Sequence, residues 1–572
     1  MNVSVARRTI PLWIVFPAIF LAITAAHGPL LRLPYYWDEA GYYIPAAFDF
    51  FRTGALIPYS TLSNAHPPLP AIYLTLWWKL FGFSPLVTRI AMCFMASIAL
   101  TAVWKIALLT TARNSVASFT VLLTALYPVF FAQSSLAHAD LTAAAASLWA
   151  IAFLLRRTSS GIWLSAFCFS LAALSKETAI VTPLALALCE LRKALGRSKE
   201  NSVASTQAAG APGLASETWD NSPRVPQVSR LRPGIPPREV PNTSRLRPGI
   251  TAAILSLPVL PLVLWYLYHR HRTGFVFGNP EYLRYNAGAT LDPLRILLAL
   301  GHRILHITAH MNLFVPVLLM IACMLLPPLK ESDGSGRERI SFADQAIFYV
   351  VIAANILFFS ILGGALLTRY LLPLYPLVIL LCVNTFRRRF EWWPSLVALS
   401  AVAFVAGLFV NPPYRFAPED NLAYANVIRL HQEGIAHIVD HYSHDTILTA
   451  WPATDELSKP ELGYVSQPIK VAAIDNFSFG QIQKAKQEPE AYSVAFLFST
   501  KYDPPHLLMS LGPKNEQLDR RFFDFHRDLE PQTVTRILDG DMVWRAQRKG
   551  QWAALIHLNR AAEAELQPVI QP

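Results

Sequence analysis

The sequence predicts a mostly α-helical protein that crosses a membrane many times and carries a soluble α/β domain in its C-terminal region. Its composition is the first observation: 53% of the 572 residues are hydrophobic and 15% are charged, whereas about a quarter are charged in soluble domains. The second observation is that long apolar runs continue to about residue 410 and then give way to an ordinary soluble composition. We therefore expect a membrane domain over 1–410, a soluble domain over 411–572, and the lipid bilayer as a partner.

A helix crosses the hydrocarbon core of a bilayer with about 20 apolar residues. About eleven runs are predicted to do so: residues 10–31, 86–109, 115–133, 139–155, 160–175, 178–192, 251–269, 312–329, 343–363, 371–386 and 394–410. The first run has no A-x-A cleavage site, so it is predicted to be a retained signal anchor.

The Lys and Arg residues predict the orientation of these spans. Loops on the cytoplasmic side are enriched in Lys and Arg. With the N-terminus inside, alternation places the following basic positions inside: Arg113, Arg156, Arg157, residues 192–247, Lys330, Arg337, Arg339 and Arg387 to Arg389. The loop 270–310, with five arginines, is the exception on the outside. This distribution explains the net charge of +11 without a nucleic-acid partner. An odd number of spans puts the C-terminal domain outside. The expected location of the protein is a bacterial inner membrane.

Two stretches are not counted as spans. The run 67–82 is short, opens with two prolines and contains Lys79, so we predict a helix on the membrane surface within the first outer loop, 32–85. The stretch 193–248 is rich in Pro, Ser and Arg and contains SRLRPGI twice, which predicts a disordered cytoplasmic insert.

The region 411–572 reads as a small α/β domain. A polar helix pattern covers 418–442, and strand-like segments follow at 446–451, 470–474 and 493–498. Near the end, the pattern VTRIL-DG-DMVWR predicts a hairpin whose two-residue turn is Asp539-Gly540.

The first outer loop holds the most informative polar residues. Asp38 and Glu39 follow the first span among aromatic residues that include Tyr42. Ionisable groups near membrane depth mark function, although an interfacial aromatic belt and a solvated helix face would produce the same residues. His66 precedes two prolines, where a histidine has either a packing role or a substrate contact.

Three further residues lie at the predicted outer ends of spans. Asp140 opens a helix, so it is either an N-cap or a second carboxylate facing the first. Lys176 precedes Glu177 and forms either a buried pair with it or a phosphate contact. Arg369 suits bidentate phosphate recognition, while a snorkelling side chain is the common alternative.

Taken in order, these residues resemble a known superfamily, the GT-C glycosyltransferases. The resemblance is to the protein O-mannosyltransferase and aminoarabinose transferase families, and it spans about residues 10–410. It is carried by Asp38-Glu39 with Tyr42, His66-Pro67-Pro68-Leu69, Leu80-Phe81-Gly82 with Arg89, Asp140, and Arg369-Tyr370-Leu371-Leu372-Pro373.

The resemblance implies a sugar transfer from a polyprenyl-phosphate donor in a cavity open to the outer side. Asp38 matches the catalytic base of the family, and like-charge repulsion from Glu39 would strengthen it, so both are predicted to be catalytic residues. Aminoarabinose transferases usually have a lysine where His66 stands, which leaves the acceptor (protein, lipid or glycan) and the local phosphate contacts in question.

The chemistry agrees with this implication. A hydroxyl that attacks an anomeric carbon needs a carboxylate to take its proton, and Lys176 or Arg369 would stabilise the departing phosphate. No Gly-rich phosphate loop occurs, and no cofactor is required by the pattern, although Asp140 and Glu39 leave a divalent cation open. The alternatives are a transporter of lipid-linked glycans and a non-catalytic envelope assembly subunit.

Overall fold

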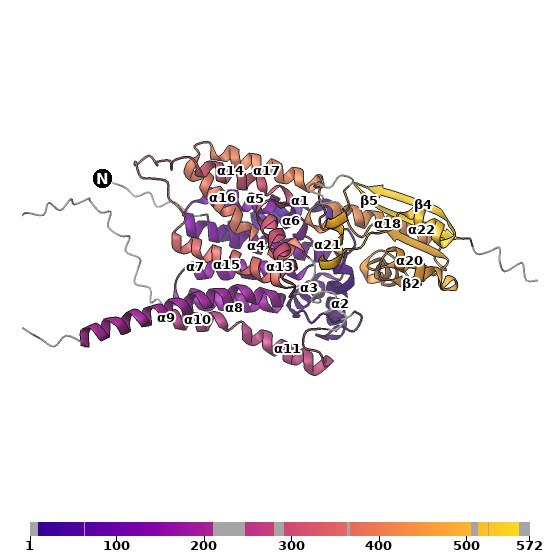
Figure 1. Cartoon of the computed structure of the whole chain (residues 1–572), viewed down its shortest axis with the longest axis horizontal. Coiled ribbons are helices and arrows are strands. Elements are labelled where there is room, and N and C mark those ends of the chain that lie inside the picture. Colours follow the sequence, from indigo (N-terminus) through magenta and orange to yellow (C-terminus); the bar gives the residue numbers. More distant parts are fainter. Residues whose placement is uncertain are drawn as a thin grey trace, which may run out of the picture.

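A computed structural model describes residues 10–61, 63–209, 246–278, 291–362, 366–504, 513–523 and 525–559, without the side chains of 197–209 and 513–515. A bundle of helices forms one part of the molecule, and a small α/β domain caps one of its ends (Figure 1). The predicted fold class, mostly helical with an α/β domain after the bundle, is confirmed.

Every predicted span overlaps a helix. In chain order these are α1 (Leu12–Ala26), α4 (Pro85–Thr111), α5 (Asn114–Leu126) with α6 (Pro128–Gln133), α7 (Ala139–Leu155), α8 (Ser159–Ser175), α9 (Val181–Ala209), α10 (Pro248–Ser256) with α11 (Val259–Thr273), α14 (Phe314–Met324), α15 (Phe342–Ile361), α16 (Tyr375–Arg389) and α17 (Trp393–Phe409). Within the described residues, three helical runs are long and apolar enough to cross a membrane, or four with one bent pair. The number eleven therefore stays a prediction.

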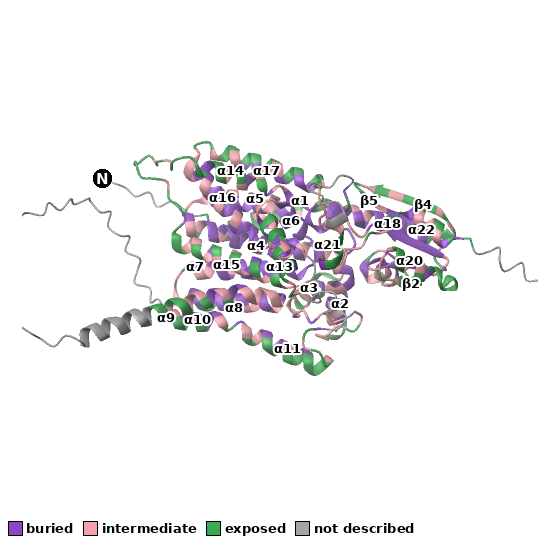
Figure 2. Cartoon of the chain, viewed as in Figure 1, coloured by how far each residue is buried: buried purple, intermediate pink, exposed green. Residues whose placement is uncertain are grey.

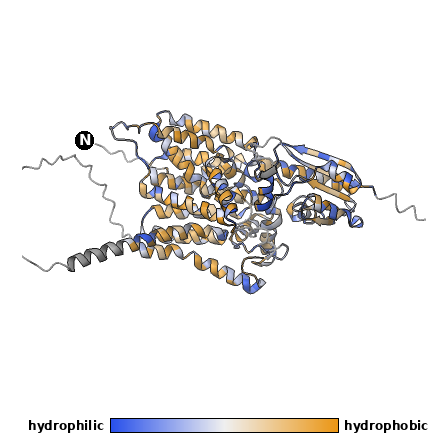
Figure 3. Ribbon diagram, viewed as in Figure 1, coloured by the Kyte–Doolittle hydropathy of each residue, from blue (hydrophilic) through white to orange (hydrophobic). Residues whose placement is uncertain are grey.

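The bundle is packed through small residues and is apolar on its outside. α4 and α7 lie side by side and bury many alanines, such as Ala96 and Ala144, which let helix backbones approach closely. Large apolar side chains such as Leu21, Phe167 and Leu264 are exposed instead. Figure 2 shows exposed positions along the outer helices, and Figure 3 shows that these helices are hydrophobic. This is the surface expected of a protein that contacts lipid.

The predicted surface helix corresponds to α3 (Leu69–Phe81), which packs beside α2 (Ile44–Thr53). Its 13 residues reach about 20 Å at 1.5 Å per residue, whereas the hydrocarbon core is about 30 Å thick. Helix α14, which overlaps a predicted span, is shorter still, so the expectation that 67–82 does not cross stays a prediction.

The predicted insert begins later than the sequence suggested. α9 continues to Ala209, so residues 193–209 are helical rather than disordered. Hydrophobic periodicity ends before residue 193, which predicts the end of the span. The helix nevertheless continues, because its residues have adequate helix propensity. Residues 210–245, with the first copy and the start of the second copy of SRLRPGI, lie outside the described residues.

The predicted outer loop 270–310 contains a helix that explains two of its arginines. α13 (Pro293–Thr308) meets α14 at a bend of 98°. Arg295 donates to the carbonyl of Leu362 at 2.8 Å, and Arg303 donates to that of Leu367 at 2.7 Å. Both side chains are buried and bind carbonyls at and beyond the end of α15. They are therefore not the exposed loop charges that the positive-inside rule counts.

The α/β domain is built on a five-stranded mixed sheet with the order β2-β1-β3-β5-β4. β1 (Ile447–Ala450), β2 (Val471–Ile474) and β3 (Val494–Phe498) are parallel and match the three predicted strands. β4 (Gly540–Arg548) and β5 (Gln551–Leu558) form an antiparallel pair against β3. α18 (Ala423–His441) packs against β4 and β5.

The predicted hairpin turn was wrong. Residues Pro531–Leu538 form a helix, α22, and Asp539 ends it in the left-handed conformation with φ of 55°. Asp-Gly suits a left-handed helix end as well as a hairpin turn. The hairpin joins β4 and β5 instead, and its turn is Lys549-Gly550, both with positive φ.

The α/β domain rests on the first outer loop. The Tyr464 hydroxyl donates to the carbonyl of Tyr35 at 2.9 Å, and Lys459 Nζ donates to that of Ser60 at 3.2 Å. The ring of Trp451 covers Gly41 so closely that a Cβ there would lie 2.5 Å from its indole nitrogen. The loop that carries Asp38 is thus held from both sides, by the bundle and by the domain.

Candidate functional site

Arg369 is the centre of a buried ionic cluster. It lies in the 3₁₀ turn η5 (Thr368–Leu371), just before α16. Its Nη2 pairs with Asp38, its Nη1 pairs with Glu419, and its Nε lies 3.3 Å from Asp140 Oδ2. The guanidinium is 3% exposed, so water screens these pairs little. Arg369 does not snorkel to a surface but joins three parts of the chain.

Lys176 completes this cluster. It follows α8, and its Nζ lies 2.5 Å from Asp140 Oδ1 and 3.8 Å from the centre of the Tyr370 ring. We call Asp38, Asp140, Lys176, Arg369 and Glu419 the arginine cluster. When all five are ionised, two cations face three carboxylates, and the net charge is −1.

A cavity opens beside the two cations of the arginine cluster. It holds about 350 Å³ of empty volume, open solvent included, and its wall includes Asp140, Lys176, Arg369 and Tyr370. Small residues of α7, Ala143 among them, form another part of the wall. Fixed cations at the wall of a cavity are what an anionic group such as a phosphate ester requires.

Asp38 is the accessible carboxylate of the arginine cluster. Its side chain is 21% exposed, against 2% for Asp140 and 4% for Glu419. It immediately precedes a π-helical turn, η2 (Glu39–Tyr43), and follows Trp37, which has a φ of 47°. Single π turns are frequent at functional sites. Asp38 is therefore the carboxylate best placed to meet a substrate.

Glu39 has a different setting from its neighbour. It is fully buried and pairs with Arg89 of α4, whose Nη2 lies 2.9 Å from Glu39 Oε2. The backbone N–H groups of Tyr36 and Ala137 donate to the same carboxylate at 2.9 and 2.5 Å. Arg89 also donates to the carbonyls of Pro34 and Ser135 at 2.8 Å. Glu39 thus joins the first outer loop to α4 and to the loop before α7.

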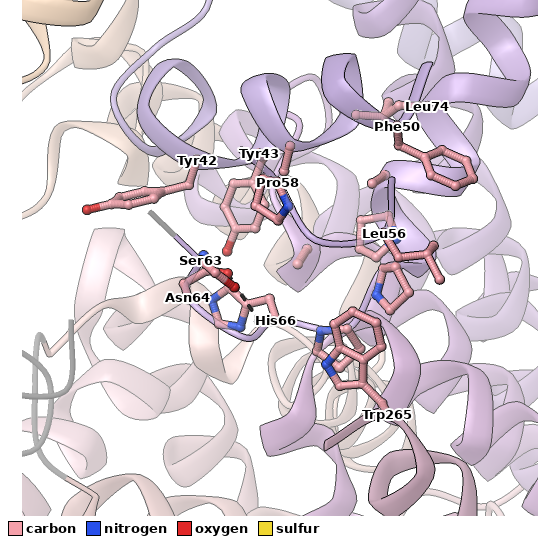
Figure 4. Close-up of a pocket in the computed structure, with 16 residues that line it drawn as sticks. Tyr42, Tyr43, Phe50, Leu56, Pro58, Ser63, Asn64, His66, Leu74 and Trp265 are labelled. Atoms are coloured by element: carbon pink, nitrogen blue, oxygen red, sulfur yellow. Dashed lines mark hydrogen bonds between the residues drawn. The ribbon is translucent and has the colours of Figure 1, made fainter. Parts of the chain in front are cut away.

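His66 and Tyr42 lie next to the arginine cluster rather than in it. His66 Nδ1 is 2.8 Å from Glu177 Oε2, so Glu177 pairs with His66 and not with Lys176. Both predicted residues line a second, aromatic cavity, where the ring of Tyr43 faces His66 and Tyr42 points away from it (Figure 4). Tyr42 contacts Trp451, with ring centres 5.8 Å apart.

Of the seven residues predicted from the sequence, the structure brings together Asp38, Asp140, Lys176 and Arg369. Glu39, His66 and Tyr42 lie outside the arginine cluster and contact Arg89, Glu177 and Trp451, respectively. Glu419 was missed, because the sequence Pro418-Glu419-Asp420 looks like the acidic start of the first soluble helix. Its place directly after the last apolar run was the available signal.

The donor set does not fit a metal ion. In the part of the chain that the structure describes, no group of three or more His, Cys, Asp or Glu side chains could hold one. Asp140 is matched by Lys176 and Arg369, and Glu39 is matched by Arg89. Each of the two carboxylates considered for a cation thus already faces a cationic side chain, and we derive no step through a metal.

Comparison with known proteins agrees with the expected superfamily. Residues 65–209, which include His66, Asp140 and Lys176, match the family described as dolichyl-phosphate-mannose-protein mannosyltransferase. No curated protein sequence matches the chain. Similar solved structures include ArnT from Cupriavidus metallidurans bound to undecaprenyl phosphate, with 14% identity, 95% of this chain and 98% of that chain covered, and a TM-score of 0.49.

A second similar structure is the archaeal oligosaccharyltransferase AglB from Archaeoglobus fulgidus, in complex with an inhibitory peptide and a dolichol-phosphate. It is 10% identical, with 97% of this chain and 75% of that chain covered and a TM-score of 0.40. Because these similarities are distant, the superfamily assignment depends on the family match and on the residues that indicate the same superfamily. The match over residues 65–209 indicates a glycosyltransferase of the GT-C superfamily.

Proposed function

We propose that this protein transfers a sugar from a polyprenyl-phosphate donor to a hydroxyl acceptor on the outer face of the membrane, with Asp38 as general base and inversion at the anomeric carbon. The observation that carries the proposal is that two cations, Arg369 and Lys176, line the wall of a cavity in an apolar bundle, and that the accessible carboxylate Asp38 pairs with Arg369. The description of the matched family names a dolichyl-phosphate sugar carrier, which supports this donor class.

In the proposed reaction, the acceptor oxygen attacks the anomeric carbon and its proton passes to Asp38. The bond between that carbon and the phosphate oxygen breaks, and the polyprenyl phosphate leaves with the electron pair. Negative charge grows on the departing phosphate, where Arg369 and Lys176 lie close enough to stabilise it. Both cations are nearly buried, at 3% and 8% exposure, so their effect on that charge is strong.

Donor binding requires an exchange of ion pairs. Without a donor, Arg369 contacts Asp38 directly, whereas in an inverting transfer the base and the leaving group lie on opposite sides of the sugar ring. The donor phosphate would therefore replace Asp38 on the guanidinium. The freed carboxylate could then turn toward the acceptor hydroxyl.

The aromatic cavity is the proposed place for the part of the substrates next to the reacting bond. Its wall and the wall of the cavity beside Arg369 and Lys176 contain neighbouring residues at the start of α7, Ala139 in the first and Asp140 in the second. His66, fixed by Glu177, and Tyr42 would contact the sugar or the acceptor there.

The test is release of free polyprenyl phosphate by the purified protein in a membrane extract that supplies donor and acceptor, followed by mass spectrometry. Asp38→Asn keeps the shape and removes the base, so release should fall by roughly 100-fold or more. Asp541→Asn is the matched control: Asp541 is exposed on β4 and belongs to the Asp-x-Asp pattern that a nucleotide-sugar enzyme would use.

The outcomes separate the alternatives. A native rate for the Asp38→Asn variant would refute the assignment of the base. If the native protein released no polyprenyl phosphate but moved the lipid-linked sugar between leaflets, it would be a transporter. If the native protein transferred sugar without releasing polyprenyl phosphate, and the Asp541→Asn variant lost that transfer, a nucleotide-sugar donor would be favoured instead.

A further inference from the structure

A short turn after the last span reaches into the arginine cluster. The 3₁₀ turn η6 (Pro418–Asp420) lies between α17 and the α/β domain, and the side chains of Glu419 and Asp420 are both buried. These consecutive acidic residues bind the consecutive residues Thr368 and Arg369: Glu419 pairs with Arg369, and the Thr368 hydroxyl donates to Asp420. The junction to the C-terminal domain is thus part of the site.

Further contacts fix this turn firmly. His310, at the bend between α13 and α14, lies 3.0 Å from Asp420 Oδ2. The Gln133 side chain donates to the carbonyl of Glu419 at 3.3 Å. Because the Glu419 carbonyl and the neighbouring Asp420 side chain are both held, the turn does not depend on the ion pair with Arg369 alone for its position.

Charge balance distinguishes Glu419 from the other carboxylates of the arginine cluster. A donor phosphate adds negative charge to a cluster that already has one carboxylate in excess. Asp140 is compensated by Lys176, and Asp38 is partly exposed to water. Among the described ion pairs, Glu419 has Arg369 alone, and it is 4% exposed. When Arg369 turns its charge to a phosphate, Glu419 is the carboxylate left without compensation.

Burial raises the pKa of Glu419 to about 8, which supports this assignment. Arg369 opposes the rise, while Asp38, Asp420 and Asp140 add to it through like charge. The phenol of Tyr36 also faces Glu419. A carboxyl with a pKa of about 8 is mostly protonated at pH 7 and mostly ionised at pH 9, so donor binding adds a proton to it only at the higher pH. The protonated form can still accept a hydrogen bond from a guanidinium.

We infer that Glu419 is a positioning residue of the site: it holds Arg369 in place and, by being protonated when the donor is bound, lets the guanidinium pass from carboxylates to the donor phosphate. The inference rests on the proposed donor class. The proton comes from solvent, no covalent bond changes, and one negative charge leaves the cluster as the phosphate enters it.

The test measures the affinity of the purified full chain for undecaprenyl phosphate at pH 6.5 and pH 9. If binding needs protonated Glu419, the apparent Kd of the native protein rises about tenfold at one pH unit above a pKa of about 8, and little at pH 6.5. Glu419→Gln stays neutral and keeps an acceptor for Arg369, so it should lack this rise. The ionisation of the lipid phosphate itself is common to both proteins and cancels in the comparison.

Two variants control the test. Glu433→Gln removes an exposed glutamate that pairs with Arg548 on the α/β domain, and it should behave as the native protein does. Glu419→Asp keeps a titrating group and should restore the pH dependence. If the Glu419→Gln variant showed the native pH dependence, or bound the lipid weakly at both pH values, the inference would be wrong and the residue merely structural.

A measurement on the native protein needs no variant. Calorimetric titration with undecaprenyl phosphate at pH 8.5, in two buffers with different ionisation enthalpies, should show uptake of a large fraction of one proton. No uptake would contradict the inference while leaving Asp38 as the proposed base. No binding of undecaprenyl phosphate by the native protein at any pH would overturn both the inference and the proposed donor class.

Discussion

At the scale of single residues, the sequence indicated which side chains are candidates for the site better than it indicated which partner each side chain contacts. Asp38 and Glu39 are adjacent and of the same type, yet one faces the arginine cluster and the other faces Arg89. Consecutive residues of a helical turn point about 100° apart, so an acidic pair can rarely serve one site. Lys176 and Glu177 divide their partners in the same way. Glu419 stayed hidden because its partner lies 50 residues away in the sequence.

Arg369→Lys should separate a phosphate contact from a simple charge. Lysine keeps the charge but loses the planar fork with which Arg369 reaches three carboxylates. Losing one or two charged hydrogen bonds should weaken undecaprenyl phosphate binding by roughly ten- to a hundredfold. Arg548→Lys, in an exposed pair on the α/β domain, is the matched control. Equal affinity in the Arg369→Lys variant and the native protein would show that the guanidinium does not touch the donor.

At the scale of elements, the places of helices and strands followed the hydrophobic patterns, and the connections did not. The three parallel strands were found because each is a short apolar run. The hairpin turn was misplaced because Asp-Gly ends a helix as readily as it turns a hairpin. Arg295 and Arg303 were read as loop charges because nothing in a sequence shows that a side chain will bind carbonyls of a distant segment.

The Glu39–Arg89 pair joins three elements: the first outer loop, α4 and the loop before α7. Glu39→Gln would leave a buried arginine uncompensated, and breaking a buried pair costs about 3–5 kcal/mol. We therefore expect a clearly lower thermal midpoint in detergent for this variant, whereas Asp38→Asn, at a more exposed position, should melt close to the native protein. If the Glu39→Gln variant kept the native midpoint and lost turnover as Asp38→Asn does, Glu39 would be catalytic after all.

At the scale of the whole molecule, contacts follow the predicted sorting of charges. Arg113 and Arg387, both predicted inside, bind the same Glu331, and Arg157 binds Asp344. The arginine cluster unites residues that were predicted to lie outside. The alternation of apolar runs could predict this separation, because each missed or added span would have mixed the residues predicted inside with those predicted outside. The side of the membrane on which each group lies stays a prediction.

Cysteine labelling tests that orientation. In intact cells, an impermeant thiol reagent should reach Arg520→Cys in the C-terminal domain and should not reach Asp220→Cys in the insert. The five native cysteines lie in apolar runs, and Cys93, Cys323 and Cys382 are buried, so their background should be low. Labelling at position 220, or its absence at position 520, would invert or break the proposed topology. Permeabilised cells, in which both positions should react, provide the control.

The attachment of the α/β domain has a thermodynamic consequence. This domain touches the Asp38 loop through Tyr464 and Lys459, and the junction before it touches Arg369 through Glu419. Two equilibria that share the same contacts are linked, and the linkage is reciprocal. If docking of the domain on the bundle changes the affinity for donor by some factor, donor binding must change the docking equilibrium of the domain by the same factor. The α/β domain, which takes no part in the bond that breaks, would thereby change its docking when a lipid binds in the helix bundle.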